Sequence, residues 1–244
     1  MKAHIFFLLI VLAKTVIAQS SYVYSVTQSK IDPSIGEAED VAELIAPYTA
    51  KLQAAMNQVI GFAPKTIDKH GPGSGALGRL MAEVLKEAVA KSLHIKVDLG
   101  VQNPGGIRAE IPAGNITVGT IYRLMPFENE IAVVDMTGQQ LELLFQEMGS
   151  RIKDFGAAVA GAHLTYKNGQ LVSAKISGKK IERNKIYKVA LTDYLHKGGG
   201  DYPILWEGKN YRSAGLTFRD ALLNYVKQKR KLIAPKDANI KVEE

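Results

Sequence analysis

Two separate loops place polar and aromatic residues where they could bind a flat, anionic ligand. The turn in "QNPGGIR" carries Asn103, Gly106 and Arg108, and the later stretch "PFEN" carries Phe127 and Asn129. Glycines let a turn approach a ligand closely, and an arginine can donate paired hydrogen bonds to anionic oxygens. Phenylalanine adds an apolar face on which a ring can stack. These residue types indicate ligand binding.

A third loop, "TDYLHKGGGDY", adds Tyr194, a run of glycines and Asp201. A flexible glycine tract beside an aromatic ring and a carboxylate suits closure over a flat ring with exocyclic donors. Taken singly, each loop could equally be an ordinary turn, with Phe127 in the core and Arg108 in solvent. Taken together, the two aromatic residues and the turn with Arg108 predict a slot for a nucleobase and its sugar.

Residues that could catalyse a reaction on their own do not form a recognisable set. "DKH" at 68–70 is superficially like the Asp-x-His that opens a binuclear phosphoesterase site, but no later Asn-His or His-x-His accompanies it. A nucleophile elbow, a P-loop and a dinucleotide fingerprint are also missing from the sequence. We expect no catalytic residues, no metal site and no cofactor in this chain. The histidines are scattered without ligand-like spacing: His4, His70, His94, His163 and His196.

Helices with an apolar face must support these loops. Apolar residues at helical spacing predict a long amphipathic helix within 36–61, bent or interrupted near Pro47 and ended by Gly61. The same spacing predicts four further helices, over residues 77–93, 117–126, 139–152 and 216–231.

Strands are predicted between these helices. Alternating or continuous apolar runs indicate strands over 95–103, 130–138 and 185–195, a short strand within 21–32, and an edge strand at 240–242. Asn168-Gly169 predicts a β-hairpin over 162–178. The mixture predicts an α/β fold of the α+β type, a mixed β-sheet flanked by helices. We assign residues 19–40 to an N-terminal extension and residues 41–244 to one domain.

The first residues predict export. "MKAHIFFLLIVLAKTVIAQS" has a charged start, a short apolar run and a small residue, Ala18, before Gln19, as secretory signal peptides do. A bilayer span needs about 20 apolar residues, more than this run provides. We expect a signal peptide over residues 1–18 and a periplasmic or secreted protein without a stable membrane anchor. A retained anchor is the alternative.

The amino-acid composition limits the kinds of partner that we expect for this chain. The chain lacks cysteine, so packing alone must hold an exported fold. Its net charge is +7, but the lysine-rich stretches lack the interleaved aromatic residues of a nucleic-acid surface. We therefore expect solvated basic faces and no nucleic-acid partner.

The three loops, in this order, resemble the C-terminal, substrate-binding domain of the 5'-nucleotidase family. The specific segments are "NPGGIR", "AGNITVGTIYRLMPFEN", "VVDMTGQQLELLF" and "TDYLHKGGGDY". The resemblance runs from about Leu44 to the last predicted helix and is closest to exported versions that consist of this domain alone. Full-length enzymes of this family pair it with an N-terminal binuclear metallophosphoesterase domain that hydrolyses the phosphate ester.

The resemblance implies a role for each candidate residue. Phe127 and Tyr194 would stack on the two faces of the base. Asn129 and Asp201 would contact base or ribose. The ribose and phosphate would face the turn that carries Asn103, Gly106 and Arg108.

This chain departs from the family pattern at three points. Pro104 replaces a glycine in the Asn-Gly-Gly-Gly-Ile-Arg motif and removes one N–H donor. The arginine usually found before the second helix is missing. Asp201 comes one residue later than in the family's Gly-Gly-Asp-Gly, so that Gly200 is a candidate for its position.

The resemblance implies a nucleotide- or nucleoside-binding domain that works with a separate metallophosphoesterase chain, on which divalent metals are expected. The alternative is a non-catalytic periplasmic binding or scaffold protein that has lost the nucleotide pocket. A complete enzyme with an unrecognised site is a third hypothesis.

Overall fold

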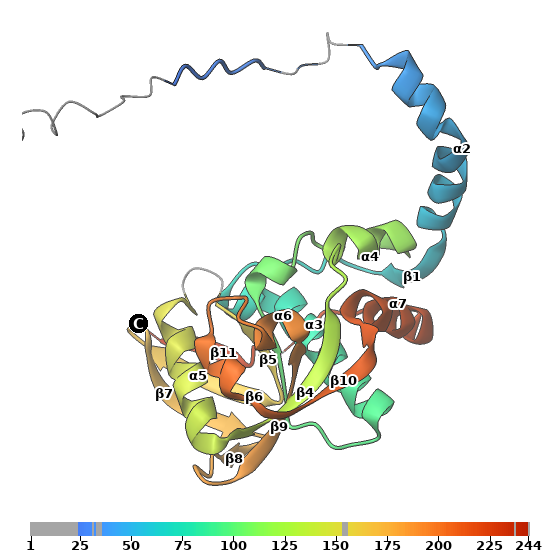
Figure 1. The fold of residues 1–244 in the computed structure, drawn as a ribbon. Helices are drawn as coiled ribbons and strands as arrows, with labels where there is room; N and C mark the ends of the chain where they lie inside the picture. Colours follow the sequence, from blue (N-terminus) through green and yellow to red (C-terminus); the bar gives the residue numbers. More distant parts are fainter. Residues whose placement is uncertain (1–23, 31, 33–35, 153–155, 237, 244) are drawn as a thin grey trace, which may run out of the picture. The chain divides into compact units, whose positions relative to one another are not determined.

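The computed structural model describes residues 24–30, 32, 36–152, 156–236 and 238–243 (Figure 1). Contacts divide the chain between Ala46 and Pro47 into two units. In the first unit, residues 24–30 and 32 form neither helix nor strand, so the strand predicted within 21–32 is wrong where the residues are described. Burial does not stabilise a strand there, because Tyr24 and Val26 stay exposed. The predicted signal peptide, residues 1–18, lies outside the described residues.

The described residues form six α-helices and eleven strands. The helices are α2 (Glu39–Met56), α3 (Gly75–Leu93), α4 (Val118–Leu124), α5 (Gly138–Ser150), α6 (Asp193–His196) and α7 (Phe218–Lys229). The strands are β1 (Val59–Ala63), β2 (Leu99–Gln102), β3 (Gly114–Thr117), β4 (Glu130–Thr137), β5 (Ala158–Ala160), β6 (Ala162–Lys167), β7 (Gln170–Ile176), β8 (Lys179–Lys180), β9 (Ile186–Thr192), β10 (Lys209–Thr217) and β11 (Ile240–Glu243). None of the described helices has the length and apolar character that crossing a membrane requires.

Helix α2 continues through Pro47 without interruption, but it ends at Met56 and does not extend to Gly61 as predicted. The residues beyond it form β1, which pairs antiparallel with β3 and buries Ile60. Gly61 does not end a helix; instead, α7 packs closely against it. A Cβ at this position would lie 2.7 Å from Cγ1 of Val226 in α7. Strand pairing therefore overrides the helical spacing of this segment.

The predicted hairpin is confirmed as β6 and β7, with Lys167 opposite Gln170. Asn168 and Gly169 both have positive φ, 51° and 77°, as the two central residues of a type I′ turn require. The predicted edge strand is β11, which pairs parallel to β6 at the edge of a sheet with the order β11-β6-β7-β8.

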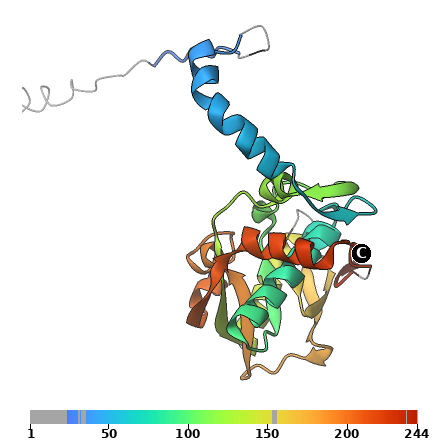
Figure 2. The same ribbon diagram turned by 90° about the vertical axis from the view of Figure 1, so that its right-hand side faces the viewer.

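Within the described residues, a five-stranded sheet has the order β10-β4-β9-β2-β5. Its β2–β9 pair is parallel and its other pairs are antiparallel, which confirms a mixed sheet. Successive side chains of a strand point to opposite faces. Ile131 and Val133 of β4 accordingly join a core with α3 and α7, whereas Val134 and Met136 join a second core with α5. Helices thus cover both faces, and Figure 2 shows α3 and α7 side by side.

Sheet topology brings the three predicted loops to one edge. The parallel strands β2 and β9 both end there, at Gln102 and Thr192. Strand β4 is antiparallel to β9 and begins at that edge, with Ile131 opposite Thr192. The turn after β2, the loop before β4 and helix α6 after β9 therefore meet. Ligand sites of open α/β sheets commonly lie at strand carboxyl ends of this kind.

Candidate functional site

The three loops line one pocket of about 560 Å³. This volume lies in the range of small-molecule sites. Six of the seven residues predicted from the sequence line it: Asn103, Gly106, Arg108, Phe127, Asn129 and Tyr194. The other lining residues are Gln102, Gly105, Met125, Glu128 and Thr192. A larger hollow of about 720 Å³ lies between α3 and α7, but none of the predicted residues lines it.

Asp201 does not line this pocket. Its carboxylate pairs with Arg151 at 2.8 Å, just after the end of α5. The glycine before it packs beside the pocket instead, because a Cβ on Gly200 would lie 3.2 Å from Cβ of Asn103. The structure thus places Gly200, and not Asp201, next to the Asn103 turn.

The two predicted aromatic residues present partly open surfaces. Phe127 is 38% exposed and Tyr194 is 48% exposed. Gly199 lies directly against the Tyr194 ring, so close that a Cβ there would overlap the ring atoms, and its N–H donates to the Tyr194 carbonyl at 2.8 Å. The glycine tract therefore supports Tyr194 by backbone contact, which a residue with a side chain could not provide without moving the ring.

Helix α7 holds the Phe127 loop in place. Arg219, only 7% exposed, donates from Nη1 to the Phe127 carbonyl at 3.4 Å and pairs with the Glu128 carboxylate. Its guanidinium also lies 4.3 Å from the centre of the Tyr122 ring, a cation–π contact. Arg219 could not be predicted from the sequence, because an arginine in a polar first turn looks the same whether it is solvated or buried.

The turn after β2 is held by buried amides. The Gln102 Nε2 donates to the Asn103 backbone carbonyl at 3.0 Å and to the Asn103 Oδ1 at 3.2 Å. A Cβ on Gly106 would overlap Gln102 Nε2, so a side chain at this position would displace the Gln102 amide. The Gln102 Oε1 is buried and accepts no hydrogen bond from the described residues, which leaves an acceptor beside the pocket.

Arg108 supplies the positive charge of the pocket. Its Nη1 lies 3.5 Å from the Gly105 carbonyl, and no carboxylate of the described residues pairs with it. An exposed guanidinium without a carboxylate partner can donate to an anionic group of a ligand.

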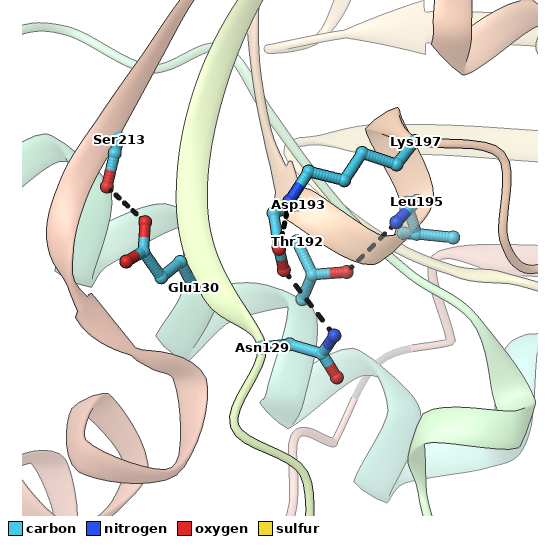
Figure 3. A network of polar contacts seen from close by, with 7 residues as sticks. All are labelled: Asn129, Glu130, Thr192, Asp193, Leu195, Lys197 and Ser213. Atoms are coloured by element: carbon cyan, nitrogen blue, oxygen red, sulfur yellow. Dashed lines mark hydrogen bonds and ion pairs between the residues drawn. The ribbon is translucent and has the colours of Figure 1, made fainter.

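A polar network lies behind Asn129 (Figure 3). The Asn129 Nδ2 donates to the Asp193 Oδ1 at 3.4 Å, and the Lys197 Nζ donates to the Asp193 Oδ2 at 2.9 Å. Burial disfavours the charged Asp193 carboxylate, but the hydrogen bonds from Lys197 and Asn129 outweigh it and hold the pKa of Asp193 below its usual value. Asp193 is therefore ionised at neutral pH.

Metal-ligating side chains do not gather anywhere in the described part of the chain: no group of three or more histidine, aspartate or glutamate residues could hold an ion. The "DKH" loop at 68–70 does not provide such a group either. The His70 Nδ1 lies 3.4 Å from the Asp68 Oδ1 and 3.6 Å from the Glu110 Oε1, but the histidine side chain is 75% exposed.

Comparison with known proteins agrees with this fold. The family model described as "5'-nucleotidase, C-terminal domain" matches residues 55–207, and the chain belongs to this family. It is 28% identical over 210 residues to a 5'-nucleotidase of Vibrio vulnificus and 27% identical over 202 residues to the protein UshA of Escherichia coli. The chain spans 36% of the length of each relative, and the matches cover 81% and 80% of this chain.

Solved structures share the fold. The 5'-nucleotidase precursor of Thermus thermophilus superposes with a TM-score of 0.73 at 22% identity, covering 84% of this chain and 43% of that one. The NAD nucleotidase of Haemophilus influenzae superposes with a TM-score of 0.65 at 20% identity, covering 84% and 41%.

Proposed function

We propose that the pocket binds a nucleotide or nucleoside, with the base between Phe127 and Tyr194 and the phosphate facing Arg108. Asn103 and Gly106 would face the ribose. The observation that carries this proposal is that residues from three separate loops line one pocket. Membership of the 5'-nucleotidase C-terminal domain family supports a nucleotide-related ligand.

The chemistry of the pocket supports such a ligand. Each aromatic ring that stacks on a base contributes about 0.5–1.5 kcal/mol beyond the burial of apolar area. Arg108 can form a charge-assisted hydrogen bond with a phosphate, roughly twice as strong as a neutral one. Buried amides of Gln102 and Asn103 add polar groups that can fix the orientation of a sugar.

Hydrolysis would require a second chain. In this proposal, a separate metallophosphoesterase carries the divalent metals that activate water and neutralise the phosphate. The present chain would hold the base and ribose and present the phosphate ester to those metals. Both proteins would act outside the cytoplasm, in the periplasm or after secretion, because the sequence begins with the pattern of a signal peptide.

Calorimetric titration of the purified chain with adenosine, AMP and UDP-glucose tests this proposal. We expect saturable binding of at least one ligand, weakened about tenfold or more by Phe127→Ala or Tyr194→Ala. Phe62→Ala is the matched control, because Phe62 is 44% exposed on β1 and does not line the pocket. Thermal melting gives a second reading, since a ligand at 100 times its Kd stabilises the fold by about 2.7 kcal/mol.

The alternative is a scaffold or binding protein that has lost the nucleotide pocket. It is favoured by the pairing of Asp201 with Arg151 outside the pocket and by the proline at position 104. Absence of heat and of any melting shift with all three ligands would support this alternative against the proposal.

A further inference from the structure

Asn129 lies between the pocket and a charged pair outside it. Asn129 lines the pocket, whereas Asp193 and Lys197 do not. Asp193 is the first residue of α6, and its side chain is 21% exposed. One carboxylate oxygen accepts from the Asn129 Nδ2 and the other accepts from the Lys197 Nζ, so both oxygens are occupied (Figure 3).

This arrangement fixes which way the Asn129 amide faces. An ionised carboxylate only accepts hydrogen bonds, so Asn129 must turn its NH₂ group, and not its oxygen, toward Asp193. Lys197 keeps Asp193 charged through their ion pair at 2.9 Å. None of the described residues donates to the Asn129 Oδ1, and Figure 3 shows this oxygen directed away from Asp193. The amide oxygen is thus left to accept from a ligand.

The backbone of Asn129 is also held. Its carbonyl accepts from the Phe218 N–H at 2.9 Å, at the start of α7. Two residues further on, Ile131 pairs with Thr192, the residue before Asp193. These two contacts fix the distance between the amide and the carboxylate. Phe127, two residues before Asn129, lines the same pocket, so the amide lies near any ring that stacks on it.

We propose that Asp193 is a positioning residue that makes Asn129 an acceptor for an exocyclic amino group on the ligand's ring. The inference rests on the proposed function, because it requires a base beside Phe127. A 6-aminopurine would donate to the Asn129 Oδ1. A 6-oxopurine would instead bring a second acceptor against it, leaving both oxygens without a partner. The pocket therefore selects amino-bearing bases.

AMP and IMP are suitable probes, because they carry an amino and an oxo group at the same ring position. Calorimetric titration of the wild-type chain should show that AMP binds at least about fivefold more tightly than IMP. This is the difference expected when one hydrogen bond is formed with AMP and left unpaired with IMP. In Asp193→Asn, residue 193 can present either a donor or an acceptor. The Asn129 amide is then free to reverse, and the two affinities should agree within about twofold.

A matched control exists elsewhere in the fold. Asp135 makes the same two kinds of contact, with Lys188 Nζ at 2.8 Å and Asn210 Nδ2 at 2.9 Å, and does not line the pocket. Asp135→Asn should leave the ratio of AMP to IMP affinity as in the wild type. Asp193→Ser is the second variant if Asp193→Asn does not fold, and it should lose the preference in the same way.

The outcomes separate this inference from the proposed function. Equal binding of AMP and IMP to the wild type, or a preference for AMP that survives both Asp193 variants, overturns the inference and leaves nucleotide binding intact. A chain that binds neither these nucleotides nor adenosine overturns the proposed function and the inference with it. A preference for AMP that is lost on changing Asp193 but not Asp135 supports the inference.

Discussion

Arg219 connects helix α7 to the aromatic side of the pocket. Its guanidinium is buried, stacks on Tyr122 and contacts both the Phe127 carbonyl and the Glu128 carboxylate. The positions of Phe127 and Glu128 therefore depend on a residue that does not itself line the pocket. Two residues that do not line the pocket thus position its two aromatic rings: Arg219 positions Phe127, and Gly199 positions Tyr194.

Arg219→Met should lower both stability and ligand affinity. The variant removes a charged hydrogen bond and a cation–π contact and leaves the Phe127 carbonyl with one donor fewer, so we expect a loss of about 2 kcal/mol in the free energy of unfolding. Urea denaturation measures this loss, and titration with AMP should show about tenfold weaker binding. Arg123→Met, at an exposed arginine of α4, is the control. Unchanged affinity in Arg219→Met would show that Arg219 does not position Phe127.

Gly199→Ala should weaken binding without unfolding the chain. The new methyl group would overlap the Tyr194 ring, which must rotate away from its present position. We expect AMP affinity to fall about tenfold, and the loss of unfolding free energy to stay below about 1.5 kcal/mol because Tyr194 is half-exposed and free to move. Gly36→Ala is the control, since nothing lies within 4 Å of a Cβ there. Wild-type affinity in Gly199→Ala would mean that the ring position does not matter.

The location of the site is set by the ends of β2 and β9 and the start of β4. Sequence patterns predicted β2, β4 and β9 and the loops beside them, because each strand is a buried apolar run. They did not predict β10, whose residues Lys209–Thr217 are mostly exposed and carry no apolar alternation. They also could not show that three loops share one edge, since this depends on β9 pairing parallel with β2 and antiparallel with β4.

The sequence named most of the residues that line the pocket, but not the contacts that hold them in place. Six residues on three loops were found from residue type and from the family pattern, and they line one pocket. The choice between Asp201 and Gly200 was left open, because sequence spacing cannot show that the Asp201 carboxylate reaches Arg151. The contacts of Arg219 and Asp193 join residues far apart in the chain, and no local spacing signals such contacts.

The β4–β9–β10 part of the sheet should respond to pH through Asp135. Hydrogen bonds from Lys188 and Asn210 lower the pKa of this carboxylate, against the opposing effect of burial. A lowered folded-state pKa adds stability above the unfolded value of about 3.9, and this stability is lost as pH falls through the folded-state value. Asp135→Asn should therefore cost about 1 kcal/mol at pH 7 and progressively less below about pH 4.

Denaturant unfolding of wild type and Asp135→Asn across this pH range measures the effect. Glu182→Gln is the control, because Glu182 is 68% exposed in its pair with Lys185 and exposed pairs contribute less than about 1 kcal/mol. A cost for Asp135→Asn that stays constant from pH 7 to pH 3 would contradict the account.

For the molecule as a whole, we expect ligand binding without catalysis by this chain alone. The chain matches little more than a third of its relatives' length, and its described residues offer binding groups but no cluster for a metal ion. If hydrolysis requires a second chain, as proposed, the purified chain with added Mg²⁺, Mn²⁺ or Zn²⁺ should release no phosphate from AMP above the rate of a blank. Sustained release that Arg108→Ala abolishes and a chelator does not would contradict this expectation.

One base should lie between the rings of Phe127 and Tyr194, with Arg108 beside the phosphate. A crystal structure of the chain soaked with AMP tests it most directly. We expect density for the adenine stacked on both rings and for the phosphate within hydrogen-bonding distance of the Arg108 guanidinium. Adenine bound anywhere else, or against only one of the two rings with Arg108 turned away, would contradict it.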